Sequence, residues 1–126
     1  AQKETQTIAR MKMSVTIYHN PRCRKSREAL SILEEHTDDI EIVEYLKEPP
    51  SEVELKSIIG RLGIGAIELI RKGEDDFKIN FKGQDLSEGE WIKAMVKYPK
   101  LIERPIILKG NRAIIGRPSE NVKLLF

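Results

Sequence analysis

The spacing of apolar residues changes several times along the chain, and each change marks a different predicted element. Residues 15–18 form an apolar run with β-branched and aromatic side chains, which predicts a strand. Ala29, Leu30 and Leu33 then fall at helical spacing. The alternating stretch 40–45 predicts a second strand. Strand, helix and strand in this order predict a parallel pair joined by a right-handed crossover.

The middle of the chain is predicted to be mainly helical. Ser51 with Glu54, and Ser87 with Glu90, have the spacing of capping boxes at helix starts. An apolar stripe follows each box, with these members: Leu55, Ile58, Ile59 and Leu62 after the first, and Trp91, Ile92, Met95 and Val96 after the second. A short helix is predicted at 66–71, whereas residues 77–84 are ambiguous. We therefore predict a helical insertion at about 49–101.

The last part of the chain returns to strand patterns. The apolar runs 105–108 and 113–115 are separated by Lys109-Gly110-Asn111, which predicts a hairpin. A final helix is predicted from about Pro118, since proline suits a first helical position. The whole order predicts an α/β, thioredoxin-like fold: a four-stranded mixed sheet with an inserted helical lobe, in one domain over 14–126. Residues 1–13 are expected to be a disordered tail or vector-derived.

The amino-acid composition limits the classes of protein to which this chain can belong. A chain of 126 residues with 33% charged side chains fits one globular domain, and its net charge of +2 gives no bulk field for nucleic acid or membrane binding. No apolar run approaches the ~20 residues of a membrane span. The single cysteine excludes an internal disulfide and predicts a reducing, cytoplasmic location. We expect no nucleic-acid and no membrane partner.

That cysteine, Cys23, lies where the first strand gives way to the first helix. The preceding Asn20-Pro21 predicts a turn. Unpaired N–H groups and the positive end of the helix dipole favour an anion there. Four cations lie within four residues of the cysteine: Arg22, Arg24, Lys25 and Arg27. Both effects favour the thiolate. A lone cysteine is often a small buried hydrophobe, but these flanks indicate a reactive one beside an anion site.

Other polar residues have two interpretations each. Ser26 either bonds the sulfur or satisfies a helical N–H group. His19 either tunes the thiolate or bonds the backbone at the strand end. Arg104 and Arg117 directly precede prolines, at positions where a side chain can point into a cleft. Arginine binds oxyanions through paired, charge-assisted hydrogen bonds. No set of residues has the pattern of a metal site.

Three motifs, in this order and at this spacing, carry a family resemblance. They are residues 17–27, residues 69–72, and residues 102–106 with 116–120 just beyond. Together they resemble the glutaredoxin-coupled arsenate reductases, most closely the small bacterial members with an Asn-Pro-Arg-Cys turn. The resemblance extends from Val15 to Leu125.

The resemblance implies a role for each matching residue. Cys23 matches the catalytic nucleophile. Three arginines match those that hold the arsenic oxyanion and its thiol adducts: Arg71, Arg104 and Arg117. Ser26 and His19 match residues that support the thiolate. The Arg104–Pro105 bond matches the thioredoxin-fold loop that faces the cysteine, in which the proline is cis. We expect the sulfur and the three guanidinium groups to converge on one pocket.

The resemblance also implies the reaction. The thiolate would attack arsenate, and arsenite would be the product. Because the chain has no second cysteine, the adduct would be resolved by glutathione, as co-substrate, and then by a glutaredoxin partner. We expect a small oxyanion substrate, no tightly bound cofactor, no metal and a monomer.

Other functions were weighed against this one. A general glutathione-dependent thiol oxidoreductase stays open, because Arg22, Arg24 and Lys25 replace the small residues found in the best-studied arsenate reductases. The Spx regulators share the fold and bind RNA polymerase, but many use a second cysteine where this chain has Ser26. Phosphatase-like arsenate reductases need an arginine six positions after the cysteine, where Ala29 stands; this alternative is rejected.

Overall fold

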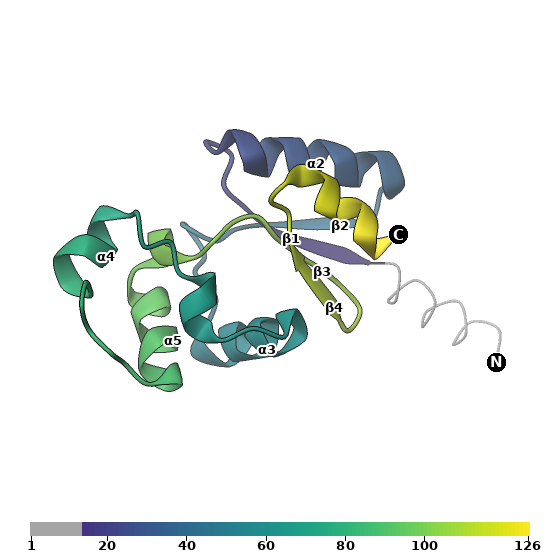
Figure 1. Cartoon of the computed structure of the whole chain (residues 1–126). Helices are drawn as coiled ribbons and strands as arrows, with labels where there is room; N and C mark the ends of the chain where they lie inside the picture. Colours follow the sequence, from purple (N-terminus) through teal and green to yellow (C-terminus); the bar gives the residue numbers. More distant parts are fainter. Residues whose placement is uncertain (1–13) are drawn as a thin grey trace. The chain divides into compact units, whose positions relative to one another are not determined.

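The structure is a computed structural model that describes residues 14–126. The prediction for residues 1–13 lies outside the described residues. The described chain divides into two compact units (Figure 1). One, called here the sheet unit, consists of 14–44 and 104–126; the other, called the helical unit, consists of 45–103.

The sheet unit begins with the predicted parallel pair. Strand β1 (Val15–His19) leads into helix α2 (Arg24–His36), which leads into strand β2 (Ile40–Glu44). The two strands pair in parallel from Val15 opposite Ile40 to His19 opposite Glu44. The strand–helix–strand prediction is therefore confirmed, and the carboxyl ends of both strands lie at the same edge of the sheet.

The predicted hairpin completes the sheet. Strands β3 (Ile106–Lys109) and β4 (Arg112–Ile115) are antiparallel, and Gly110 in the turn between them has φ +59°. Glycine reaches such positive φ without the penalty that a Cβ brings. Since β3 also pairs antiparallel with β1, the strand order is β2-β1-β3-β4. This is the four-stranded mixed sheet of the predicted thioredoxin-like fold.

The last helix differs from the prediction. It is a 3₁₀ helix, η3 (Ser119–Leu125), and Pro118 is its N-cap with φ −64° and ψ 162°. The extended ψ of Pro118 places this residue before the first helical turn, whereas the sequence predicted a first helical position. The helix still turns Val122 and Leu125 into the core, although Phe126 is exposed.

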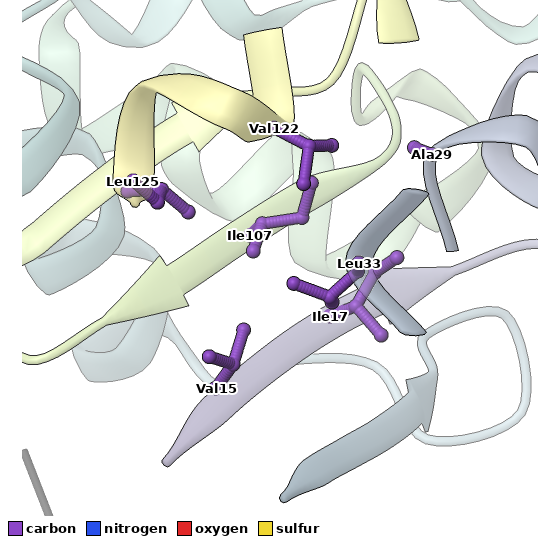
Figure 2. Close-up of a cluster of buried hydrophobic side chains, with 7 residues drawn as sticks. All are labelled: Val15, Ile17, Ala29, Leu33, Ile107, Val122 and Leu125. Atoms are coloured by element: carbon purple, nitrogen blue, oxygen red, sulfur yellow. The ribbon is translucent and has the colours of Figure 1, made fainter. Parts of the chain in front are cut away.

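Helices α2 and η3 pack on the same face of the sheet and enclose the core of this unit. Figure 2 shows the seven buried side chains of that core: Val15, Ile17, Ala29, Leu33, Ile107, Val122 and Leu125. They come from two strands and both helices. Because α2 takes part in this core through two of its turns, the start of the helix is fixed relative to the end of β1.

The helical unit contains three α-helices and two 3₁₀ helices. In chain order they are α3 (Glu52–Leu62), η1 (Ala66–Leu69), α4 (Asp75–Asn80), α5 (Glu88–Lys97) and η2 (Pro99–Leu101). The predicted helix at 66–71 is shorter than expected, because Ile70 forms a β-bridge with Ile102 instead. The ambiguous stretch 77–84 contains the end of α4.

The two predicted helix starts are confirmed, with one difference in detail. Ser87 and Glu90 form a complete capping box at the start of α5. At α3, Ser51 accepts a hydrogen bond from the Glu54 N–H group, but the Glu54 carboxylate accepts from the Ser51 hydroxyl at 3.1 Å. On the inner face of α5, Ala94 is buried whereas Val96 is only partly buried.

Aromatic side chains fill the helical unit. The rings of Phe77 and Trp91 are 6.1 Å apart, and Phe81 lies 5.9 Å from Trp91 and 5.7 Å from Tyr98 between ring centroids. Such distances are typical of favourable aromatic pairs. These residues therefore pack against one another within the helical unit. Within residues 14–126, no helix is long and apolar enough to cross a membrane.

Candidate active site

Cys23 is the N-cap residue of α2, as the sequence predicted, and it is half-buried. Its backbone is extended, with φ −93° and ψ 121°. The turn before it is held by Asn20: the Asn20 carbonyl accepts from the Cys23 N–H at 3.0 Å, and the Asn20 side-chain oxygen accepts from the Arg22 N–H at 3.1 Å. The sulfur thus lies on an ordered turn, at the end of the helix whose dipole favours anions.

The cationic side chains near Cys23 have different partners. Arg24 and Lys25 form ion pairs with Glu28 at 3.1 and 3.9 Å, on the exposed side of α2. Arg27 instead reaches back, and its Nη1 donates to the Pro21 carbonyl at 2.9 Å. Exposed pairs of the first kind stabilise a protein weakly. The Arg27 contact fixes the turn and keeps a positive charge beside it.

Ser26 and His19 form a buried polar pair next to this turn. His19 is 6% exposed and Ser26 is fully buried, and 2.6 Å separates His19 Nδ1 from Ser26 Oγ. The Ser26 hydroxyl also accepts from the Asn20 N–H at 3.1 Å. Ser26 therefore satisfies a backbone N–H group in the turn before the helix, and His19 bonds a serine side chain. The sequence analysis had given two alternatives for each residue, and a bond between the two side chains was not among them.

The environment of His19 favours its neutral form. Burial lowers the pKa of His19 below the ordinary 6.5, the carboxylate of Glu44 raises it, and the guanidinium of Arg27 lowers it, in decreasing order of effect. Burial removes water from the charged imidazolium, which is the dominant cause. Glu44 stands directly opposite His19 in the β1–β2 ladder. The Glu44 carboxylate thus opposes the lowering of the His19 pKa by burial and by Arg27.

Arg104 and Arg117 lie at the same edge of the sheet as Cys23. Near the end of β1, Tyr18 is opposite Ile106, and Ile106 is opposite Ile115. Arg104 precedes β3 and Arg117 follows β4, so strand register brings both to this edge. The two segments are joined by a hydrogen bond of 2.8 Å from the Gly116 N–H to the Pro105 carbonyl.

The two arginines share a backbone feature. The Arg104–Pro105 bond is cis, as the family resemblance predicted, and the Arg117–Pro118 bond is also cis. The second was not predicted, because only about 5–6% of X–Pro bonds in folded proteins are cis and no residue nearby signals one. Both arginine side chains are half-buried.

Two further residues support these loops and were missed from the sequence. Asn121 donates through Nδ2 to the carbonyls of Ile115 and Arg117, each at 3.2 Å. Gly116 allows close packing, since a Cβ there would lie 2.9 Å from Cγ of Pro105. The role of Gly116 depends on contacts with other segments of the chain and has no local signal, whereas the partners of Asn121 lie only four and six residues earlier.

Arg71, the third predicted arginine, belongs to the helical unit. It follows η1, and its N–H donates to the Leu101 carbonyl at 2.7 Å. Its Nη1 pairs with Glu74 at 2.8 Å, and its Nε lies 3.7 Å from Glu103. These two carboxylates hold the guanidinium in place within its unit. Its role in substrate binding stays a prediction.

Comparison with known proteins decides the family. The model of the ArsC family matches residues 18–125, which is most of the chain. The chain belongs to the ArsC family. It is 44% identical over 112 residues to the arsenate reductase of Haemophilus influenzae, covering 87% of this chain and 97% of that one. It is 46% identical over 114 residues to the Escherichia coli (strain K12) protein YfgD, with coverages of 89% and 96%.

Solved structures of ArsC-type proteins agree with this fold. The arsenate reductase from Vibrio cholerae is 40% identical, with a TM-score of 0.85, covering 90% of this chain and 98% of that one. Within residues 14–126, no group of three or more His, Cys, Asp or Glu side chains is placed to hold a metal ion. The side chains described above give the candidate active site of this ArsC-family protein: a cysteine, a buried histidine–serine pair and the loops of two arginines.

Proposed function

We propose that this ArsC-family protein is an arsenate reductase in which Cys23 is the nucleophile. One observation carries the proposal: the cysteine at the N-cap of α2 shares one sheet edge with the loops of Arg104 and Arg117. An anion at that edge meets a helix N-terminus and two guanidinium groups. The names of the relatives from Haemophilus influenzae and Vibrio cholerae support arsenate as that anion.

In the first step, the Cys23 thiolate attacks the arsenic atom of bound arsenate. A sulfur–arsenic bond forms, an arsenic–oxygen bond breaks, and the oxygen leaves as water after taking up a proton. Arsenic is still pentavalent in this adduct. A glutathione thiol and a glutaredoxin thiol then supply two electrons, so that arsenic becomes trivalent with loss of water and the two thiols end as a disulfide. Water displaces the Cys23 sulfur from arsenic, which breaks the sulfur–arsenic bond, releases arsenite and restores the thiolate. The protein itself needs no second cysteine and no tightly bound cofactor.

The arginines would stabilise charge during this step. Arsenate is a tetrahedral oxyanion, and a guanidinium donates paired hydrogen bonds to two of its oxygens. Arg104 and Arg117 would neutralise the charge on those oxygens as the sulfur attacks. Arg71 is proposed as the third ligand because it matches the family motif at residues 69–72.

Ser26 and His19 would support the thiolate. A hydroxyl has one proton to donate and two lone pairs to accept with. If Nδ1 of His19 carries a proton, the Asn20 N–H and Nδ1–H occupy both lone pairs of Ser26. The Ser26 proton is then available to the sulfur of Cys23, three positions earlier on the same helical turn. A hydrogen bond to the charged form favours the thiolate.

The direct test is Cys23→Ser in an assay that couples arsenate reduction to NADPH oxidation through glutathione, glutaredoxin and glutathione reductase. Turnover should fall to the rate without enzyme, because serine is not a nucleophile of comparable strength here. Circular dichroism checks that the variant is folded. Turnover retained in a folded Cys23→Ser variant would contradict the proposal.

The anion-binding role is tested separately with three variants: Arg71→Ala, Arg104→Ala and Arg117→Ala. Each should raise the KM for arsenate by about tenfold or more, the loss expected for a hydrogen bond to a charged group. Arg112→Ala is the matched control, because Arg112 is exposed at the opposite end of β4. An equal KM in all four variants would show that these arginines do not bind the substrate.

The same assay addresses the alternative of a general glutathione-dependent thiol oxidoreductase. The exposed cations Arg24 and Lys25, beside the half-buried sulfur, favour capture of an anionic thiol such as glutathione. A low-molecular-weight disulfide replaces arsenate in a parallel measurement. Turnover with the disulfide and none with arsenate would decide for the alternative. Either reaction fits a monomer in the cytoplasm, where glutathione and glutaredoxin are present, and that is the location and state we propose.

A further inference from the structure

Helix α2 begins with charges of the sign that a helix start disfavours. Its first turn contains no acidic residue and carries Arg24 and Lys25 instead. The α-helices of the helical unit begin in the usual way, each with two acidic residues in the first turn: Glu52 and Glu54 in α3, Asp75 and Asp76 in α4, and Glu88 and Glu90 in α5. Cations at the positive end of a helix dipole lower the stability of the helix. Helix stability therefore does not explain the cations that begin α2.

These cations are exposed next to the candidate nucleophile. The side chain of Arg24 is 84% exposed and that of Lys25 is 52% exposed. Arg22, on the other side of Cys23 in the chain, is exposed as well. Among residues 14–126, no hydrogen bond or ion pair holds its guanidinium. We call Arg22, Arg24 and Lys25 the cationic patch.

The cationic patch keeps an excess of positive charge. The carboxylate of Glu28 lies 3.1 Å from Arg24 and 3.9 Å from Lys25. One carboxylate thus faces two cations, and Arg22 adds a third. Arg27 contributes a further positive charge beside the same turn. Because exposed ion pairs are weak, the two pairs with Glu28 leave the patch able to bind other carboxylates.

The exposure of the patch fits a macromolecular partner better than a small ligand. Small molecules bind in concave sites that bury most of their surface, whereas the side chains of the patch are exposed. A protein that brings a thiol to Cys23 must come close to these charges, since consecutive Cα atoms are about 3.8 Å apart and charges interact over about 10 Å at 0.1 M salt. Complementary charge raises the rate at which two proteins associate. The patch therefore favours an acidic partner.

We propose that the cationic patch is the docking surface for the protein thiol that reduces the Cys23 adduct, and that this partner carries Asp and Glu side chains around its own thiol. The proposal rests on the proposed function, in which Cys23 is the nucleophile and external thiols complete the reaction. It adds the chemistry by which the protein reductant is recognised.

The test uses a mixed disulfide of Cys23 with glutathione, so that no arsenate is needed. Glutathione disulfide forms it: the Cys23 thiolate attacks one sulfur, and one glutathione leaves as a thiolate. The thiolate of a glutaredoxin with an acidic active-site face then attacks the glutathione sulfur. The bond to Cys23 breaks, Cys23 leaves as a thiolate, and the glutaredoxin keeps the glutathione in a mixed disulfide of its own. Mass spectrometry of the full chain follows the loss of glutathione.

Two variants reverse the charge of the patch, and a third is the matched control. The reversals are Arg22→Glu and Lys25→Glu. The control, Lys123→Glu, makes the same change of charge on an exposed residue of η3. Two residues further on, the Leu125 carbonyl accepts a hydrogen bond from Lys109, which pairs with the first residue of β1. The control thus lies toward the end of the sheet opposite to the cysteine turn, which follows the last residue of β1.

Two uncharged reagents measure the sulfur itself. Dithiothreitol reduces the same mixed disulfide. Iodoacetamide alkylates the free thiol, and its rate reports only on Cys23 because the chain has one cysteine. Reversing a charge beside the sulfur also makes the thiolate less favourable. The rate with glutaredoxin is therefore divided by the rate with dithiothreitol, which leaves the contribution of docking.

Each reversal should lower this ratio about tenfold at low salt, because the electrostatic attraction between the two proteins is lost. The difference should nearly vanish at 1 M salt, where the Debye length is about 3 Å. Lys123→Glu should behave like the wild type. A glutaredoxin with a basic active-site face should show the reverse order, with the two reversals faster than the wild type.

Each outcome decides the matter. A lower ratio that is confined to the two reversals and is abolished by salt supports the proposal. An unchanged ratio overturns it, because the cations then act only on the sulfur, as slower alkylation also shows. An equal loss in Lys123→Glu overturns it in favour of net charge, and an equal loss with glutathione in place of glutaredoxin overturns it in favour of a small anionic thiol. Since no arsenate is involved, the Cys23→Ser assay judges the proposed function separately.

Discussion

The sheet unit and the helical unit differ in what they bury. Among residues 14–126, the buried histidine and serine side chains are His19, Ser26 and Ser119, and all three belong to the sheet unit. The interior of the helical unit is mainly apolar and aromatic, and two of its serines, Ser51 and Ser87, serve as exposed helix caps. Burying a polar group is costly unless it is hydrogen-bonded. The unit that bears this cost is the one that carries the candidate nucleophile.

This difference predicts two classes of variants. Substitutions in the sheet unit should change stability and the reactivity of Cys23 together, because its polar interior is connected to the turn. Substitutions in the helical unit, those of the proposed ligand Arg71 apart, should change stability without changing the reactivity of Cys23. The following experiments test that separation, from the largest expected effect to the smallest.

Trp91→Ala should have the largest effect on stability. Trp91 is 5% exposed and contacts two phenylalanine rings of the helical unit. Removing a large buried aromatic side chain costs about 3–5 kcal/mol. Denaturant unfolding measures the loss, and iodoacetamide measures Cys23 under native conditions. If Trp91→Ala changed the alkylation rate of Cys23 as much as Ser26→Ala does, the proposed separation between the two classes of variants would be wrong.

Gly116→Ala should be nearly as harmful. The added methyl group would lie 2.9 Å from Cγ of Pro105, 3.1 Å from Cδ1 of Ile107 and 3.2 Å from Cβ of Ala29. Overpacking of this kind costs up to about 3 kcal/mol, and it should also raise the KM for arsenate by displacing the arginine loops. Gly60→Ala in α3 is the control: nothing lies within 4 Å of its added Cβ, and it should stabilise the chain by about 0.5–1 kcal/mol.

Ser26→Ala should cost about 2 kcal/mol, because the Asn20 N–H and the His19 ring lose their buried partner. It should also slow the alkylation of Cys23. Ser87→Ala is the counterpart in the helical unit, where loss of the N-cap of α5 costs about 1 kcal/mol. Denaturant unfolding and alkylation of both variants, measured together, show whether only the buried serine affects the sulfur.

The smallest expected effect is a pH dependence of stability. The pKa of His19 in the folded chain is lower than its ordinary value of 6.5, so the unfolded chain binds more protons between the two values. The contribution of His19 to the free energy of unfolding is therefore fully present above pH 6.5, and it is lost as the pH falls through the lowered pKa of the folded chain. Denaturant unfolding of the wild type and of His19→Gln over this range measures it. Identical pH profiles would contradict the prediction.

Much of the fold could be predicted because its signals are local. The turn at Asn20-Pro21, the capping residues Ser51 and Ser87, and the hairpin around Gly110 each depend on a few neighbouring residues. The two errors differ in kind. Ile70 left the predicted helix to pair with Ile102, which lies 32 residues further along the chain. Pro118 is an N-cap because its ψ is extended, so the helix begins one residue later than predicted.

The candidate site was predictable only in part. Cys23 was identified from its own flanks, and the arginines from their resemblance to family motifs. The roles of Gly116 and Asn121 were not predicted. Gly116 allows close packing against Pro105, Ile107 and Ala29, which belong to other segments of the chain. Asn121 donates to the carbonyls of Ile115 and Arg117, which are near in sequence, but no motif marks that role. The pairing of Glu44 with His19 depends on a strand register that no short stretch of sequence reveals.

The sequence by itself determined that a lone cysteine stands at a helix start after a strand, since turn, cap and helix spacing are fixed by residues within one or two turns. Only the tertiary structure decided that His19 meets Ser26 and that the loops of Arg104 and Arg117 share an edge with Cys23. The physical reason is the distance along the chain over which each kind of interaction acts. A hydrogen-bond ladder between strands converts positions far apart in the chain into neighbours, and the register of that ladder is chosen by how the core packs.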